Sequence, residues 1–122
     1  MPMAKIMVVD DSATLRHMVV HVLREAGHEI SQAESAEQAL SRIESFAPEL
    51  VLTDLYMCGL DGIELAREIR TIPGYRDTPI LVLSTDSSMA VKQRGKANGV
   101  NGWIAKPFDP EILQGVVQKV LH

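Results

Sequence analysis

Five short apolar runs, each followed by a segment with helical periodicity, restrict the fold of this chain more than any other feature of its sequence. The runs cover residues 6–9, 29–33, 50–53, 79–83 and 102–105, and the second is the least apolar. Short runs of this kind are typical of strands buried on both faces. Strands that alternate with helices form parallel sheets with right-handed crossovers. The pattern therefore predicts an α/β fold, a (βα)5 doubly wound five-stranded parallel sheet of the flavodoxin-like class.

The segments between the runs carry the signals of helix starts and ends. Apolar residues recur at helical spacing within residues 15–26, 36–46, 61–70, 88–97 and 110–121. Ser35 and Gln38 have the spacing of a capping box, and Asp109 followed by Pro110 is typical of a helix start. Gly27 is expected to end the first helix as a C-cap.

Length and composition indicate one domain, expected to span residues 1–122. The net charge of −4 lacks the basic excess of a nucleic-acid-binding protein. No segment approaches membrane-spanning length, and the apolar run Ile6–Val9 is too short for a signal peptide. The single cysteine, Cys58, has no internal disulfide partner, which is compatible with a reducing cytoplasm. We therefore expect a cytoplasmic protein with no nucleic-acid or membrane partner.

Polar residues with related chemistry follow four of the five apolar runs. They are Asp10 and Asp11 after the first run, Asp54 after the third, Ser84 after the fourth and Lys106 after the fifth. The carboxyl ends of parallel strands meet at one edge of the sheet, which is where ligands bind in such folds. These side chains should therefore lie together, although any strand must end in something polar.

Three carboxylates in one pocket repel one another unless a cation binds, and a few hard oxygen ligands suit Mg²⁺. A lysine is a common phosphate-binding charge, and a carboxylate can itself accept a phosphoryl group. Phosphoryl transfer requires little beyond positioning and charge neutralisation. The group of residues therefore predicts a site at which one aspartate becomes phosphorylated.

Four segments of the chain, in order and with matching spacing, resemble the signature segments of the response-regulator receiver domain: VVDDS, LTDLYMCGLDG, ILVLSTD and GWIAKPF. The segment from STDS through KQRGKANGVNGWIAKPF is most similar to the chemotaxis CheY type, which implies a CheY-like fold. The resemblance implies that Asp54 is the phosphoacceptor and that Ser84 and Lys106 contact the phosphoryl group. It also implies a Mg²⁺ site formed by Asp10, Asp11, Asp54 and the main-chain carbonyl of Tyr56. Ser84 and Trp103 would be the switch residues, and the Lys106–Pro107 bond would be cis.

The same resemblance implies the partners. A histidine kinase of the CheA type would donate the phosphoryl group. The phosphorylated chain would bind a target, with the flagellar motor switch as one candidate, through the helix at 88–97, the strand at 102–105 and the helix at 110–121. It would not be an enzyme, since its chemistry is limited to its own phosphorylation and dephosphorylation. Mg²⁺ would be its cofactor.

Three residues depart from the usual pattern of the family. Cys58 stands where proline is usual, so the loop is expected to be less rigid. Trp103 replaces the usual tyrosine or phenylalanine. Thr85 replaces a common alanine and is expected to restrict access to the phosphoryl group.

Other functions share part of this pattern. A phosphorelay shuttle that passes phosphate to a histidine phosphotransfer protein would need the same site, so this alternative stays open. A phosphatase working through an aspartyl phosphate would need a second aspartate two residues after the first, where this chain has Ser12 or Tyr56. A nucleotide-binding module would need a glycine-rich loop after the first strand, which is missing.

Several other charged or titratable residues are expected to be solvated or unpaired. They are His17 and His21, spaced as a metal pair but off the apolar stripe, His28 and His122, and the basic run of Lys92, Arg94 and Lys96.

Overall fold

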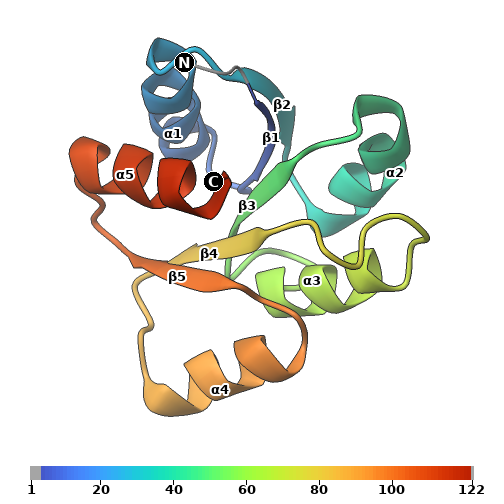
Figure 1. Ribbon diagram of the computed structural model, residues 1–122. Helices are drawn as coiled ribbons and strands as arrows, with labels where there is room; N and C mark the ends of the chain where they lie inside the picture. Colours follow the sequence, from blue (N-terminus) through green and yellow to red (C-terminus); the bar gives the residue numbers. More distant parts are fainter. Residues whose placement is uncertain (1–3, 122) are drawn as a thin grey trace.

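The computed structural model describes residues 4–121, and its ten elements follow the predicted order (Figure 1). The elements are β1 (Lys5–Val9), α1 (Ala13–Glu25), β2 (Glu29–Ala33), α2 (Ala36–Phe46), β3 (Leu50–Asp54), α3 (Gly62–Arg70), β4 (Ile80–Ser84), α4 (Met89–Ala97), β5 (Gly102–Ala105) and α5 (Pro110–Leu121). The predicted (βα)5 fold is confirmed. No helix within these residues combines the length and the apolar character needed to cross a bilayer.

The five strands form one parallel sheet in the order β2-β1-β3-β4-β5. The register pairs Val9 with Thr53, Asp54 with Leu83, and Ser84 with Ala105. The carboxyl ends of β1, β3, β4 and β5 therefore lie side by side. This edge is where the residues expected to form the site emerge.

Helices cover both faces of the sheet (Figure 1). One face packs Ile6, Leu52 and Leu81 against buried residues of α1 and α5. The other face packs Met7, Val51 and Ile80 against α2 and α3. Successive strand residues alternate between these two clusters because side chains alternate across a strand. Runs that are apolar at every position therefore bury both sides, as the sequence pattern requires.

Side-chain caps begin all five helices. The hydroxyls of Ser12, Ser35 and Ser88 and the carboxylate of Asp61 each accept a hydrogen bond from the main-chain N–H three residues later. Asp109 caps α5, because its Oδ1 accepts from the Glu111 amide at 2.8 Å and from the Ile112 amide at 3.4 Å. Such caps satisfy amides that have no partner within the helix.

Two details of the helix ends differ from the sequence prediction. The complete capping box is Asp61 with Glu64, whereas the Gln38 side chain accepts from the Glu34 amide rather than returning to Ser35. The C-cap of α1 is Ala26, and Gly27 follows it at φ +92°, a left-handed conformation that favours glycine.

Candidate functional site

Three carboxylates converge at the carboxyl edge of the sheet. Oxygens of Asp10, Asp11 and Asp54 all lie within 4.8 Å of one another. Asp10 is buried, with 3% of its surface exposed, Asp54 is half-buried, and Asp11 is exposed. The β1–α1 connection supplies the first two and the end of β3 supplies the third. This arrangement is the one expected from the strand ends.

Burial raises the pKa of the Asp10 carboxyl, and the nearby charges of Asp54 and Asp11 raise it further. A hydrogen bond from the Ser12 amide and the charge of Lys106 act in the opposite direction. The balance is a raised pKa, because burial and the two neighbouring acids outweigh the hydrogen bond and the single cation. A carboxylate that is buried and repelled by neighbouring carboxylates is a favourable ligand for an added cation.

Lys106 is the cation that reaches this group. Its Nζ lies 2.7 Å from Asp54 Oδ1 and 3.9 Å from Asp10 Oδ2. The Lys106–Pro107 peptide bond is cis, as the resemblance implies. One ammonium group facing three carboxylates leaves the site with an excess of negative charge.

Ser84 is the last residue of β4 and directly follows Leu83, which pairs with Asp54 of β3. It is buried, with only 2% of its surface exposed, and its Oγ accepts a hydrogen bond of 2.9 Å from the Asp86 amide. The hydroxyl of Ser84 is thus held at the site by the chain that follows it.

Thr85 is exposed and borders an apolar pocket of about 310 Å³ that is also lined by Lys106, Met18 and Phe108.

Asp86 connects three of the expected site residues, a role that sequence reasoning missed. The Tyr56 hydroxyl donates to Asp86 Oδ2 at 2.7 Å, and Trp103 Nε1 donates to the Asp86 carbonyl at 3.0 Å. The hydrogen bond with Tyr56 lowers the pKa of Asp86 and raises that of Tyr56. The signal in the sequence is faint, since it is only an acid two residues after the strand-end hydroxyl.

Trp103 packs away from the acid cluster. It lies against Leu55, Ile63 and Val82, while the next residue along β5, Ile104, belongs to the core beneath α1 and α5. A Cβ placed on Gly95 of α4 would lie 2.8 Å from Trp103 Cζ3. The glycine therefore lets α4 approach the indole closely.

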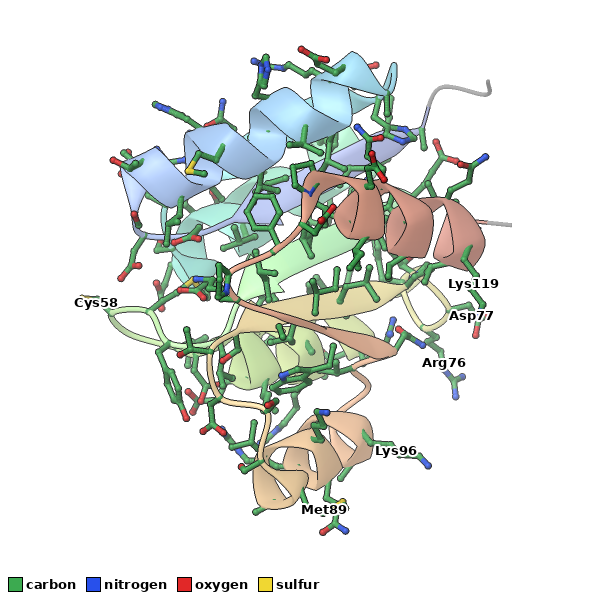
Figure 2. All side chains as sticks on the ribbon, turned by 90° about the vertical axis from the view of Figure 1, so that its left-hand side faces the viewer. Cys58, Arg76, Asp77, Met89, Lys96 and Lys119 are labelled. Carbon is green, nitrogen blue, oxygen red and sulfur yellow. The ribbon has the colours of Figure 1, made fainter. Side chains whose placement is uncertain are left out.

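The β3–α3 loop approaches the acid cluster through its main chain. The Cys58 amide lies 3.4 Å from Asp11 Oδ2, and Cys58 itself is exposed at the tip of this loop (Figure 2). Proline, the usual residue of the family at this position, has no N–H and could not donate here. Glu37 of α2 supports the same loop, because its carboxylate accepts from the Leu60 amide at 3.4 Å.

One of the histidines expected to be solvated or unpaired does not follow that expectation. His17 and His21 are both exposed, as expected, although His21 also pairs with Glu25 at 3.0 Å. His28 Nδ1, in contrast, accepts from the Ala4 amide at 3.3 Å. The prediction that His28 has no partner was wrong, because β1 begins beside the turn that contains it. His122 lies outside the described residues.

The basic run lies on an exposed face, as expected. Lys92, Arg94 and Lys96 are all exposed, and Arg94 also pairs with Asp61 at 2.9 Å. This ion pair joins α4 to the N-cap of α3, a contact between residues 33 positions apart.

The donor set fits Mg²⁺ by its chemistry. Three carboxylates offer hard oxygens at one edge of the sheet, and one of them is already desolvated and under repulsion. Lys106 supplies one positive charge against three negative ones, so a divalent cation would neutralise the group.

Comparison with known proteins agrees with the geometry. The family model described as the response regulator receiver domain matches residues 6–118. The chemotaxis protein CheY1 of Helicobacter pylori is 32% identical over 119 residues, which is 96% of each chain. The phosphate regulon transcriptional regulatory protein PhoB of Pseudomonas aeruginosa is 36% identical over 96% of this chain, which spans about half (51%) of that relative's length.

A solved structure of the Vibrio cholerae chemotaxis protein CheY4 superimposes with a TM-score of 0.94 and is 39% identical, covering 98% of this chain and 99% of that one. The similarity therefore extends over the whole sheet and the edge that carries the acid cluster.

Proposed function

The chain belongs to the response regulator receiver domain family, and on that premise we propose that Asp54 is its phosphoacceptor. As a receiver, the chain acts in two-component signal transduction. A phosphohistidine of a histidine kinase is the donor in this proposal. A carboxylate oxygen of Asp54 attacks phosphorus, the phosphorus–nitrogen bond breaks, and the released imidazole takes up a proton. The observation that carries the assignment is the 2.7 Å pair between Lys106 and Asp54 inside the carboxylate group.

The neighbouring residues prepare Asp54 for this reaction. Lys106 holds one oxygen of Asp54, which leaves the other free to attack, and its ammonium group then pairs with the phosphoryl oxygens. The Ser84 hydroxyl accepts from the Asp86 amide and keeps its own proton for a hydrogen bond to the phosphoryl group. These roles require no external substrate to be converted, so the protein acts as a switch rather than as an enzyme.

Mg²⁺ fits the cluster as the cofactor. Asp10, Asp11 and Asp54 would hold the ion, together with the main-chain carbonyl of Tyr56. Bound there, it would neutralise charge on the phosphoryl oxygens during transfer.

The output of the switch is proposed to be target binding through α4, β5 and α5. A cleft of about 680 Å³ at one end of this face is lined by four cations beside Trp103: Arg70, Arg76, Lys92 and Lys96. Within residues 4–121 none of the four forms an ion pair with a carboxylate. Arg76 and Lys96 project outward on the same side of the molecule (Figure 2). Such a surface favours an acidic target segment.

The relatives support a setting for this switch. CheY1 of H. pylori and CheY4 of V. cholerae are chemotaxis proteins, so we place this chain in chemotaxis, downstream of a CheA-type kinase and with the flagellar motor switch as target. Residues 1–122 would form one receiver domain. Its exposed free thiol, Cys58, suits the reducing cytoplasm.

Intact-mass spectrometry tests the assignment of Asp54. Incubation with acetyl phosphate and Mg²⁺ should add one phosphoryl group to the wild type and none to Asp54→Asn. Asp77→Asn, which changes an exposed carboxylate outside the cluster, is the matched control and should be phosphorylated like the wild type. An adduct of equal yield on Asp54→Asn would refute the assignment.

A further inference from the structure

Arg16 of α1 is buried to a degree that is unusual for arginine. Only 6% of its surface is exposed. Charged side chains are almost never fully buried unless they are paired. The nearest carboxylate is Glu34, at 3.9 Å, and 70% of the Glu34 side chain is exposed to solvent. An ion pair with such an exposed partner is weak, so it does not account for the burial.

The short contacts of the guanidinium explain its position. Arg16 Nη1 donates to the main-chain carbonyl of Asp10 at 2.7 Å, and Nε donates to the Gln32 side chain at 3.1 Å. The guanidinium thus joins the turn after β1 to the end of β2. Its two donors are fixed relative to each other by the planar group, which a lysine cannot reproduce.

These contacts fix the main chain of Asp10 on both sides. Its amide donates to the Ala33 carbonyl at 3.1 Å, and its carbonyl accepts from Arg16. That carbonyl belongs to the peptide plane shared with Asp11, and a peptide plane is rigid. The hydrogen bond from Arg16 therefore sets the orientation from which both carboxylates of the acid pair project.

The carboxylate of Asp10 is fixed in turn. Its Oδ1 accepts from the Ser12 amide at 2.9 Å, and its Oδ2 faces Lys106. A main chain held in this way keeps the Asp10 carboxylate close to those of Asp11 and Asp54. Residues behind metal ligands that orient them in this way commonly change metal affinity by about 10- to 100-fold when they are replaced.

From these contacts we infer that Arg16 is a positioning residue for the cation site, acting through the Asp10–Asp11 peptide. The inference rests on the proposed function, since it concerns the same Mg²⁺ site. Arg16 touches neither the ion nor the phosphoryl group in this role. Its loss should misorient the acid pair and lower the affinity of the folded protein for Mg²⁺.

The alternative is that Arg16 only stabilises the fold by satisfying a buried carbonyl. The two roles differ in what they change. A structural role lowers the free energy of unfolding and leaves the Mg²⁺ dissociation constant of the folded protein unaltered. A positioning role raises that constant whatever happens to stability.

Isothermal calorimetry with MgCl₂ as titrant, well below the melting temperature, separates the two. Arg16→Lys keeps the charge but loses the planar group whose Nη1 donates to the Asp10 carbonyl, and it should bind Mg²⁺ about tenfold more weakly, at the lower end of the range for supporting residues. Gln32→Met is the matched control, because it removes the Nε partner and leaves the contact with Asp10. This control should bind Mg²⁺ nearly as the wild type does.

Urea unfolding with and without MgCl₂ provides the second measurement. The stabilisation that Mg²⁺ produces depends only on its concentration and dissociation constant, so it should be smaller in Arg16→Lys than in Gln32→Met even if both lose basal stability equally. Wild-type Mg²⁺ affinity in Arg16→Lys would overturn the inference. A wild type that does not bind Mg²⁺ would instead overturn the metal site itself.

Discussion

Replacing Asp10 by asparagine should stabilise the protein when no metal is present. The amide side chain would keep the shape of the carboxylate and the hydrogen bond from the Ser12 amide, but the replacement would remove one of three negative charges that lie within 4.8 Å of one another. Lys106 would remain paired with Asp54 at 2.7 Å. The substitution therefore changes the charge of the cluster with little change in its packing.

The magnitude follows from the distances. At 4.8 Å and an effective dielectric constant of about 20, one pair of carboxylates repels by roughly 3 kcal/mol. Asp10 faces two carboxylates, and the repulsion by Asp11 is the weaker because Asp11 is exposed and better screened. The attraction between Asp10 and Lys106 at 3.9 Å offsets this by about 4 kcal/mol. Burial of Asp10, at 3% exposure, adds a desolvation penalty. We expect a net gain of about 1 to 2 kcal/mol in the free energy of unfolding, or roughly 4 to 8 °C in melting temperature for a chain of this size.

The pH dependence has a definite sign. Because the pKa of Asp10 is raised in the folded state, the folded protein binds a proton more readily than the unfolded chain. The destabilisation by ionised Asp10 is thus fully present above the raised pKa and decreases as the pH falls through that pKa toward 3.8. In Asp10→Asn this part of the pH profile should be absent.

Thermal and urea unfolding in EDTA measure the difference in stability between Asp10→Asn and the wild type. The same unfolding experiments in MgCl₂ measure how much Mg²⁺ stabilises each protein. The wild type should gain more stability from Mg²⁺ than Asp10→Asn, because the ion relieves the repulsion and needs the missing ligand. Asp11→Asn should change stability in the same direction by less, since Asp11 is exposed. If Asp10→Asn is less stable than the wild type in EDTA at neutral pH, the reasoning about charge repulsion is wrong.

Two further predictions concern the aromatic switch position. Gly95→Ala should lower the free energy of unfolding by about 1 kcal/mol, because the clash of the new Cβ with Trp103 at 2.8 Å costs more than the gain in helix propensity. This loss should be smaller in the Trp103→Phe background, and additive losses in the double-mutant cycle would show that the contact does not carry the effect. Trp103 emission should change on phosphorylation by acetyl phosphate in the wild type, less in Ser84→Ala and not in Asp54→Asn, because Ser84 and the indole N–H both bond to Asp86. Unchanged emission in fully phosphorylated wild type would mean that the indole does not follow Ser84.

The sequence was sufficient for the fold and for the acid cluster because both depend on local and repeating signals. Apolar runs of fixed length specify buried strands, and the polar residue that ends each run must emerge at the carboxyl edge once the sheet is parallel. Asp10, Asp54 and Lys106 meet for this reason, although 52 residues separate Asp54 from Lys106. Their meeting follows from topology and needs no knowledge of loop geometry.

The contacts that tertiary structure alone decided depend on how loops and helices are placed. Asp86, in the β4–α4 loop, bonds both Tyr56 and Trp103. Arg94 of α4 pairs with Asp61, and its neighbour Gly95 lets the same helix approach the indole closely. Arg16 occupies a polar position in the pattern of α1, yet it turns inward to the Asp10 carbonyl. Periodicity places a residue on a helix face to within a side chain's width, but a hydrogen bond requires the two atoms to lie within about 3 Å. Only the packed chain fixes positions that finely.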